Sequence, residues 1–211
     1  TVIATASLYP STMLLETNTI TDYDDGQFEN YIIADLSNNA EDKLITPSFF
    51  NLFNPLPTFK MAANGTTQEL DYLGWYGDLS GDGKSVGYRG DCDTEDGVIG
   101  VDCIGIVNDA GLNNIGDNQH FLNAINYDGS IAVGYRAYSN IHGFIWDQVN
   151  GMRDIADVLL QNGTDISGWS NVKLNDISDN GYYIAGRGVN PDGIPRNFVI
   201  SALPECTTGL Y

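Results

Sequence analysis

The chain has 211 residues and carries 28 Asp plus Glu against 9 Lys plus Arg, a formal net charge of -19. A field of that sign repels phosphate backbones and anionic lipid headgroups, so binding to nucleic acid or to a membrane surface is not expected. The 42% hydrophobic content and the 12 Tyr indicate a folded acidic domain, and no apolar run approaches the roughly 18 residues of a membrane span.

Residues 1–57 form a segment that precedes the repeats described below. Its Thr, Val, Ile and Tyr residues favour strands, and its Pro-rich end marks a connection. We expect the segment to complete a partial unit of the fold within the chain, or to add as a strand to a neighbouring subunit. It also contains an acidic turn that is a secondary candidate for a calcium loop, with Asp22, Asp24, Asp25 and Glu29.

Three stretches repeat one pattern: DLSGDGKSVGYR at 78–89, AINYDGSIAVGYR at 124–136 and DISDNGYYIAGR at 176–187. Each has an Asp-Gly or Asn-Gly step followed by a short apolar strand and an arginine. The turn glycines Gly83, Gly129 and Gly181 are about 46 and 52 positions apart, a period typical of repeat architectures. The pattern predicts a hairpin with a type I′ turn in each unit.

A second pair of strands follows each hairpin. GFIWDQVNGMRDIAD at 143–157 matches CIGIVNDAGLNNIGD at 103–117, and TFKMAANGTTQELDYLG at 58–74 is a looser copy. The alternation of Phe144 and Trp146 has the period of a strand, so we interpret Phe144, Trp146, Met152 and Ile155 as core residues of the repeat.

Four short strands per unit predict an all-β, propeller-like array of about three and a half four-stranded blades. The expected organisation is a segment at 1–57 that completes or links the fold, followed by a repeat domain at 58–211. DIADVLLQNG at 154–163 has an Asp N-cap and a terminal glycine, which predicts one short helix inserted between strands.

Residues 120–203 resemble the HAF repeat of secreted bacterial proteins, named for a His-Ala-Phe triplet. The triplet stands here as His142-Gly143-Phe144, with Gly in place of Ala, and the likeness is looser over 58–117. The resemblance implies a propeller-like fold and an extracellular or cell-surface location. It implies no particular reaction.

The stretch DCDTEDGVIGVD at 91–102 is the candidate metal loop. Asp91, Asp93, Glu95 and Asp102 offer the hard oxygen ligands that calcium prefers, although the glycine stands seventh rather than sixth. Cys92 and Cys103 can close this loop as a disulfide, and Cys206 is then left for an intermolecular bond. The alternative is three reduced, buried cysteines.

The sequence shows no identifiable catalytic constellation, so we expect a protein that is not an enzyme. His120 and His142 occupy repeat positions. A structural hydrogen bond is expected for His142, and His120 is either its counterpart one strand away or a surface residue. The favoured hypothesis is a secreted or cell-surface structural or interaction protein that assembles through its N-terminal strand, with itself or other extracellular proteins as partners.

The alternative is an extracellular protein that binds or hydrolyses polysaccharide. Binding would use exposed Trp75, Tyr76 or Trp169. Hydrolysis would require Asp78, Asp128 and Asp179 to approach one another on equivalent turns.

Overall fold

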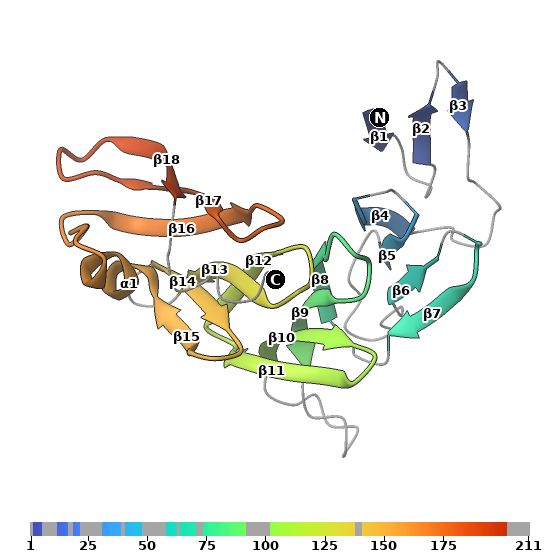
Figure 1. Ribbon diagram of the computed structural model, residues 1–211, viewed down its shortest axis with the longest axis horizontal. Coiled ribbons are helices and arrows are strands. Elements are labelled where there is room, and N and C mark those ends of the chain that lie inside the picture. Colours follow the sequence, from blue (N-terminus) through green and yellow to red (C-terminus); the bar gives the residue numbers. More distant parts are fainter. Residues whose placement is uncertain are drawn as a thin grey trace.

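The computed structural model describes residues 2–5, 12–16, 19–21, 31–38, 41–47, 58–62, 64–70, 74–91, 102–137 and 141–201. These residues form five antiparallel sheets and one α-helix (Figure 1). The predicted all-β, propeller-like array with one inserted helix is therefore confirmed. The first sheet contains three strands, β1 (Val2–Thr5), β2 (Thr12–Glu16) and β3 (Thr19–Thr21).

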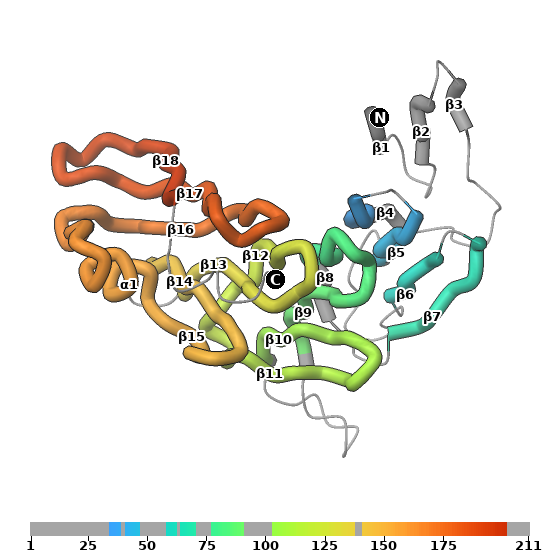
Figure 2. The backbone as a smooth tube through the Cα atoms, viewed as in Figure 1, coloured from blue at the N-terminus to red at the C-terminus, as the bar shows by residue number. Residues whose placement is uncertain are grey.

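The other four sheets follow one another in chain order, and we name them blades I to IV (Figure 2). Blade I contains β4 (Tyr31–Leu36), β5 (Lys43–Pro47), β6 (Thr58–Met61) and β7 (Thr67–Leu70). Blade II contains β8 (Gly74–Leu79), β9 (Val86–Asp91), β10 (Asp102–Asn108) and β11 (Gly111–Asp117). Blade III contains β12 (His120–Ile125), β13 (Ile131–Arg136), β14 (His142–Asp147) and β15 (Gly151–Asp154). Blade IV contains β16 (Ser170–Ile177), β17 (Tyr183–Val189) and β18 (Pro195–Ser201).

Blade I joins residues from both sides of the boundary that the sequence places after residue 57. Its third strand β6 pairs with β5, which belongs to the N-terminal segment. Residues 31–47 thus complete a sheet within the chain. The remaining strands of that segment pair only with one another among the described strands.

The hairpin between the first two strands of each repeat differs from the predicted type I′ turn. Gly83, Gly129 and Gly181 have φ values of 73°, 69° and 69°, as expected. However, Asn171 is the one non-glycine residue with positive φ among those described, so the residue before each glycine is not left-handed.

In the observed turn the glycine is the fourth and last residue. Each of these glycines donates its N–H to the carbonyl three residues earlier, as Gly129 does to Asn126 at 3.1 Å. The Asp or Asn before the glycine accepts from the backbone N–H two residues on, which stabilises a right-handed turn at that position.

A β-bulge recurs in the first strand of every blade and fixes which positions are equivalent. It lies at Ala34, Gly77, Asn123 and Asn175, where the register with the second strand shifts by one residue. The residues that follow the bulge, and are therefore equivalent, are Asp35, Asp78, Ala124 and Asp176.

The hairpins of the four blades meet at one end of the array. Backbone hydrogen bonds join Asn38 to Gly81, Asp82 to Tyr127 and Tyr127 to Asp179, at 2.9–3.1 Å. The Asn38 amide also donates to the Asp179 carboxylate at 2.5 Å, which connects blade I to blade IV. The four hairpins thus form a closed ring of contacts.

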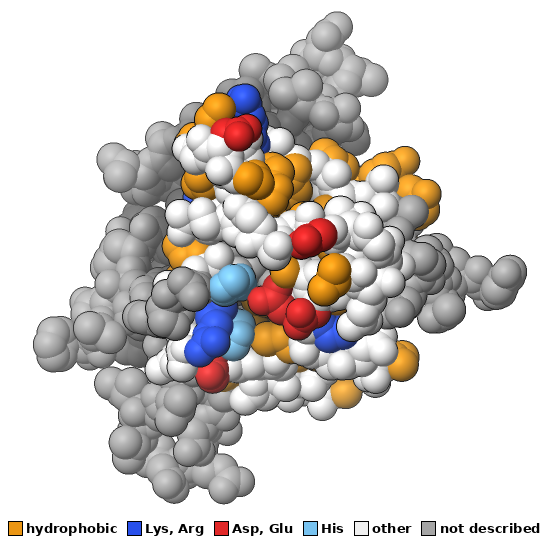
Figure 3. All heavy atoms as spheres, turned by 90° about the vertical axis from the view of Figure 1, so that its left-hand side faces the viewer, with side chains coloured by type: hydrophobic (Ala, Val, Ile, Leu, Met, Phe, Trp, Pro, Cys, Tyr) orange, Lys and Arg blue, Asp and Glu red, His pale blue; other side chains and the backbone are white. Residues whose placement is uncertain are grey.

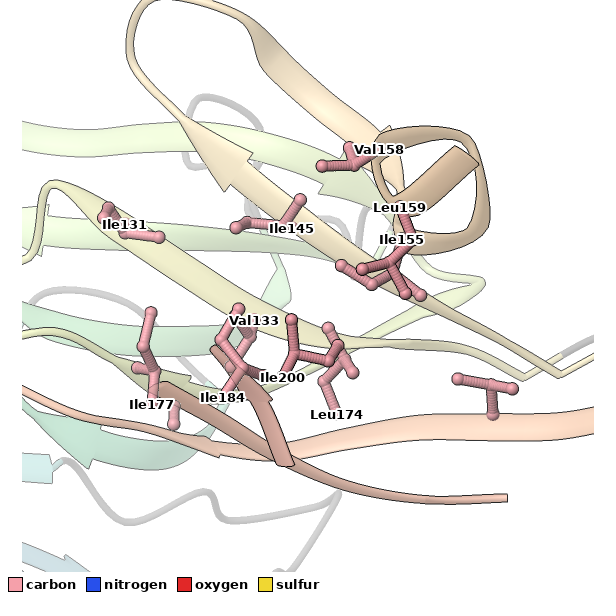
Figure 4. Close-up of a cluster of buried hydrophobic side chains, with 12 residues drawn as sticks. Ile131, Val133, Ile145, Ile155, Val158, Leu159, Leu174, Ile177, Ile184 and Ile200 are labelled. Carbon is pink, nitrogen blue, oxygen red and sulfur yellow. The ribbon is translucent and has the colours of Figure 1, made fainter. Parts of the chain in front are cut away.

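Apolar clusters fill the spaces between neighbouring blades. Ile131, Val133 and Ile145 of blade III face Ile177 and Ile184 of blade IV (Figure 4). The residues assigned to the repeat core lie in these clusters: Phe144 and Trp146 are buried between blades II and III with Met152 against them, and Ile155 is buried between blades III and IV.

The inserted helix α1 (Ile155–Gln161) begins directly after β15. Asp154 has extended backbone angles and its carboxylate accepts from the Ala156 N–H at 2.8 Å, so the predicted N-cap is confirmed. Ile155, Val158 and Leu159 turn inward and extend the core between blades III and IV. No helix in the described part of the chain is long and apolar enough to cross a membrane.

Candidate functional site

An apolar depression, here called the apolar socket, lies beside the outer strand of blade IV. Its volume is about 440 Å³, and α1, the start of blade IV and β18 line it. The principal lining residues are Ile155, Leu159, Trp169, Val172, Phe198 and Ile200. Trp169 and Phe198 contact each other edge to face, with ring centroids 5.6 Å apart.

The other blades show what occupies the equivalent place. β18 corresponds to β6, β10 and β14, each of which pairs with a fourth strand. Leu112 of β11 stands opposite Val107, and Met152 of β15 stands opposite Trp146. Each packs against the apolar cluster between its own blade and the preceding one.

In blade IV the position of Val107 and Trp146 is taken by Ile200, which lines the socket. β18 pairs with β17 alone among the described strands, so no described residue stands opposite Ile200. The socket is therefore the place where a fourth strand would insert a Leu- or Met-sized side chain.

A second feature, here called the acid cluster, gathers Asp35, Asp78 and Asp176 from the first strands of three blades. Asp35 accepts from the Leu79 N–H at 2.7 Å, and Asp78 accepts from the Ile125 N–H at 2.6 Å. Each carboxyl thus connects its own blade to the next one. The equivalent residue of blade III is Ala124, and there the Ile177 N–H turns to Asp176 of its own strand at 2.8 Å.

The acid cluster holds a proton at neutral pH. Desolvation by burial, the hydrogen bond to Asp35 and repulsion from Asp35 and Asp176 raise the pKa of Asp78 to about 8, against the opposing effect of the Ile125 N–H. A protonated carboxyl beside a second carboxyl can act as an acid and base pair, and it can equally serve as a hydrogen-bonded link between blades.

The predicted convergence of Asp78, Asp128 and Asp179 is wrong. Asp78 lies on a strand and meets Asp35 and Asp176, whereas Asp128 and Asp179 lie within the hairpin turns. These three residues stand five, one and two positions before their turn glycines, so they are not equivalent positions of the repeat. The bulge identifies the positions that are equivalent.

The two histidines stand in register on either side of Arg136, on β12 and β14. Figure 3 shows both, in pale blue, beside basic and acidic side chains. His120 Nδ1 lies 2.6 Å from Asp117 Oδ1, and its ring meets Phe144 edge to face. Burial opposes ionisation of Asp117, but hydrogen bonds from His120 and Gln119 prevail and lower the pKa of this carboxyl. His142 Nδ1 lies 3.6 Å from the capping Asp154.

The candidate calcium loop lies mostly outside the described residues. Asp91 ends β9 and Asp102 begins β10, and these two residues are register partners, so the loop closes across one strand pair. Asp93 and Glu95 lie outside the described residues, as do Asp22, Asp24, Asp25 and Glu29 of the other loop. In the described portion, no group of three His, Cys, Asp or Glu side chains is arranged to hold a metal ion.

Cys103 is buried on β10 and is disulfide-bonded. Cys92 and Cys206 lie outside the described residues, so the pairing of Cys92 with Cys103 and the intermolecular role of Cys206 stay predictions. The proposed glycan-binding Trp169 is half-buried in the wall of the apolar socket, and the side chains of Trp75 and Tyr76 are outside the description.

Comparison with known proteins identifies the fold. No family model and no curated protein matches the chain. Among solved structures, the β-propeller domain of the Trilobed protease from Pyrococcus furiosus aligns with a TM-score of 0.61 and 9% identity, over 91% of this chain and 59% of that one. The chain has a β-propeller fold.

Two other solved structures align over nearly the whole chain. TolB from Acinetobacter baumannii aligns with a TM-score of 0.53 and 13% identity, over 95% of this chain and 47% of that one. An acylaminoacyl peptidase from Pyrococcus horikoshii aligns with a TM-score of 0.55 and 11% identity, over 96% and 38%. The chain thus spans about half of the length of that TolB and less than half of that peptidase. Likeness at 11–13% sequence identity shows the fold alone.

Proposed function

We propose that this propeller is a non-catalytic structural or interaction module, located outside the cell or on its surface, that assembles by strand addition. The observation that carries the proposal is the outer edge of β18, which pairs with no other described strand and lies beside the apolar socket. An exposed edge offers backbone N–H and C=O groups to an incoming strand, and the socket supplies a pocket for one of its side chains.

The proposed incoming strand is the N-terminal segment of a neighbouring copy. Residues Thr12–Glu16, TMLLE, carry the apolar run that such a strand needs to fill the socket, and in the assembly they would exchange their pairing with β1 or β3 for the edge of β18. The extracellular location is supported by the resemblance to HAF repeats and by the disulfide-bonded Cys103. Cys206 would then lock neighbouring copies covalently.

Light scattering and electron microscopy of the full chain at several concentrations test this function. We expect oligomers or filaments that dissociate when a peptide of residues 1–21 is added in excess, because the peptide competes for the same edge. Met13→Asp or Leu14→Asp should weaken assembly, whereas Val149→Asp, on an 87% exposed turn residue, should not. A strict monomer at every concentration, with and without reductant, contradicts the proposal.

A second candidate function is the binding or hydrolysis of extracellular polysaccharide. Asp78, whose pKa is raised to about 8, can supply the acid that hydrolysis needs. Its hydrogen bond to Asp35 holds these two carboxyls closer than the roughly 5 Å or more that separates the two carboxyls of a glycosidase, so Asp35 does not fit the role of the second carboxylate. Release of reducing sugar from mixed polysaccharides, abolished by Asp78→Asn, would support this function. No release by the unmodified chain would remove it.

A further inference from the structure

Basic side chains lie close together on blade IV, although they are few in this chain. Lys173, Arg187 and Arg196 are three of the 9 Lys plus Arg residues, and all three line one depression of about 470 Å³. The rest of its lining is Asn171, Gly188, Val189, Pro195 and Asn197, with no acidic residue. We call this depression the basic pocket.

Neighbouring blades show that blade IV departs from the repeat here. The residues two before the bulge are Trp75 in blade II and Phe121 in blade III, and in blade IV this position is Lys173. Arg89 of blade II lies 3.7 Å from the centroid of the Phe121 ring, so at that junction the aromatic residue receives a cation from the preceding blade. Replacement of the ring by Lys173 adds positive charge instead.

The backbone is also specialised at the pocket. β16 has a further register shift between Ser170 and Lys173, which the first strands of the other blades lack in their described residues. Asn171 lies in this shift with φ 52°, the left-handed conformation that asparagine adopts more readily than most residues. A bulge of this kind re-aims the side chains beside it.

The arginines of the pocket are not engaged elsewhere. Arg153 is bound to Asp147 at 2.6 Å, and Arg136 to Gln119 at 2.6 and 3.1 Å. Arg187 and Arg196 have neither a hydrogen bond nor an ion pair with any other described residue. Lys173 is held by the face of the Tyr135 ring, 4.0 Å from Nζ, which leaves its ammonium charge uncompensated.

We propose that the basic pocket binds the carboxylate of a uronate, as a ligand of one or two sugar residues. A guanidinium pairs with a carboxylate through two parallel hydrogen bonds, and the amides of Asn171 and Asn197 can both donate to and accept from sugar hydroxyls. A volume of about 470 Å³ is within the usual range for a small-ligand pocket. Val189 and Pro195 are the only apolar side chains of this lining, which favours a polar ligand over an apolar peptide side chain.

The net charge of -19 favours a ligand with few charges over a long polyanion. Because the Debye length is about 8 Å at physiological salt, the pocket's own cations act on a bound carboxylate more strongly than distant acids do. The basic pocket shares Pro195, Arg196 and Asn197 with β18 but shares no lining residue with the apolar socket. Binding in the pocket goes beyond the proposed assembly and does not require the socket to be filled.

Calorimetric titration of the full chain with digalacturonate, and with neutral galactobiose, tests the assignment. We expect digalacturonate to bind, with an affinity that falls as salt is raised, and galactobiose not to bind. Arg187→Gln and Arg196→Gln should each weaken binding about 10-fold to 100-fold, the range for hydrogen bonds to a charged group. Thermal melting confirms that each variant is folded.

Lys84→Gln is the matched control, because it makes the same change of charge on an exposed side chain paired with Asp82 in a hairpin turn. It should bind like the unmodified chain. Equal binding of galactobiose, binding of sulfate without digalacturonate, loss of binding in Lys84→Gln or full binding in both arginine variants would overturn the assignment.

Discussion

Asp78→Asn is expected to remove most of the pH dependence of stability between pH 4 and 8. The pKa of Asp78 rises from 3.8 to about 8 on folding, so in this interval the folded chain holds a proton that the unfolded chain has lost. Stability from this group is complete below pH 3.8 and declines as the pH rises, by about 1.4 kcal/mol for each pH unit. About 4 kcal/mol is lost by pH 7, and the loss is complete above pH 8.

An asparagine at position 78 mimics the protonated carboxyl without titrating. Its oxygen can accept the Ile125 N–H and its amide can donate to Asp35, the two contacts that Asp78 makes. We therefore expect Asp78→Asn to match the unmodified chain at pH 4 and to be more stable by about 2–4 kcal/mol at pH 7.

Urea unfolding at pH 4, 5.5, 7 and 8 measures the effect. Asp128→Asn is the control, because it removes one charge from an exposed turn residue whose carboxylate accepts from the Ser130 N–H and from no other described residue. It should keep the pH slope of the unmodified chain. If the two variants show the same slope, general charge repulsion explains the pH dependence and the reasoning about the acid cluster is refuted.

Three further substitutions test the packing of the repeat by urea unfolding. Ile145→Ala, at a side chain that is 0% exposed between blades III and IV, should lower the free energy of unfolding by about 2–5 kcal/mol. Val199→Ala, at the equivalent position of blade IV, should lower it by less than about 0.5 kcal/mol because that side chain is 67% exposed, and equal costs would contradict the assigned equivalence. Gly134→Ala would place a Cβ against the Phe121 carbonyl and should cost about 3 kcal/mol or more. Gly163→Ala should cost about 1 kcal/mol, because a Cβ there meets open space and only the positive φ causes strain. A mild effect of Gly134→Ala would show that β12 can move. Asp154→Ala removes the N-cap of α1 and should cost about 1 kcal/mol with loss of helical circular dichroism, and an unchanged spectrum would argue against capping.

The repeat and its strands could be predicted because they depend on local chemistry. An Asp-Gly or Asn-Gly step limits the backbone to a turn, alternation sets the two faces of a strand, and Asp154 before a run of helix formers sets a helix start. The predicted turn type was wrong because a type I′ turn and the observed turn both place Gly83, Gly129 and Gly181 at positive φ. The residue that distinguishes these two turns is the first residue of the observed turn, such as Ser80, whose side chain accepts from the Ser85 N–H.

The acid cluster could not be found from the hairpins alone, because its members are 43 and 98 positions apart in the sequence. A signal was present, however: Asp35-Leu36-Ser37 and Asp78-Leu79-Ser80 are identical, and Asp176-Ile177-Ser178 differs by one residue. In each triplet the first residue follows the bulge and the third begins the turn. The triplet at Asp35 also indicates that blade I begins near residue 31.

The same equivalence explains why blade IV carries both candidate binding surfaces. A propeller repeat keeps its inner positions because each blade must fit its neighbours, as Ile131, Val133 and Ile145 do against blade IV. Val199, the counterpart of Ile145, is exposed in the described structure. Arg187 is the counterpart of Arg89 and Tyr135, each of which contacts the blade after its own, and Arg187 has no such contact among the described residues. Positions without a described following blade can change to binding roles at little cost in stability. Blade IV is therefore the place where interaction chemistry is expected, and substitutions at Arg187 should alter binding while leaving the free energy of unfolding nearly unchanged.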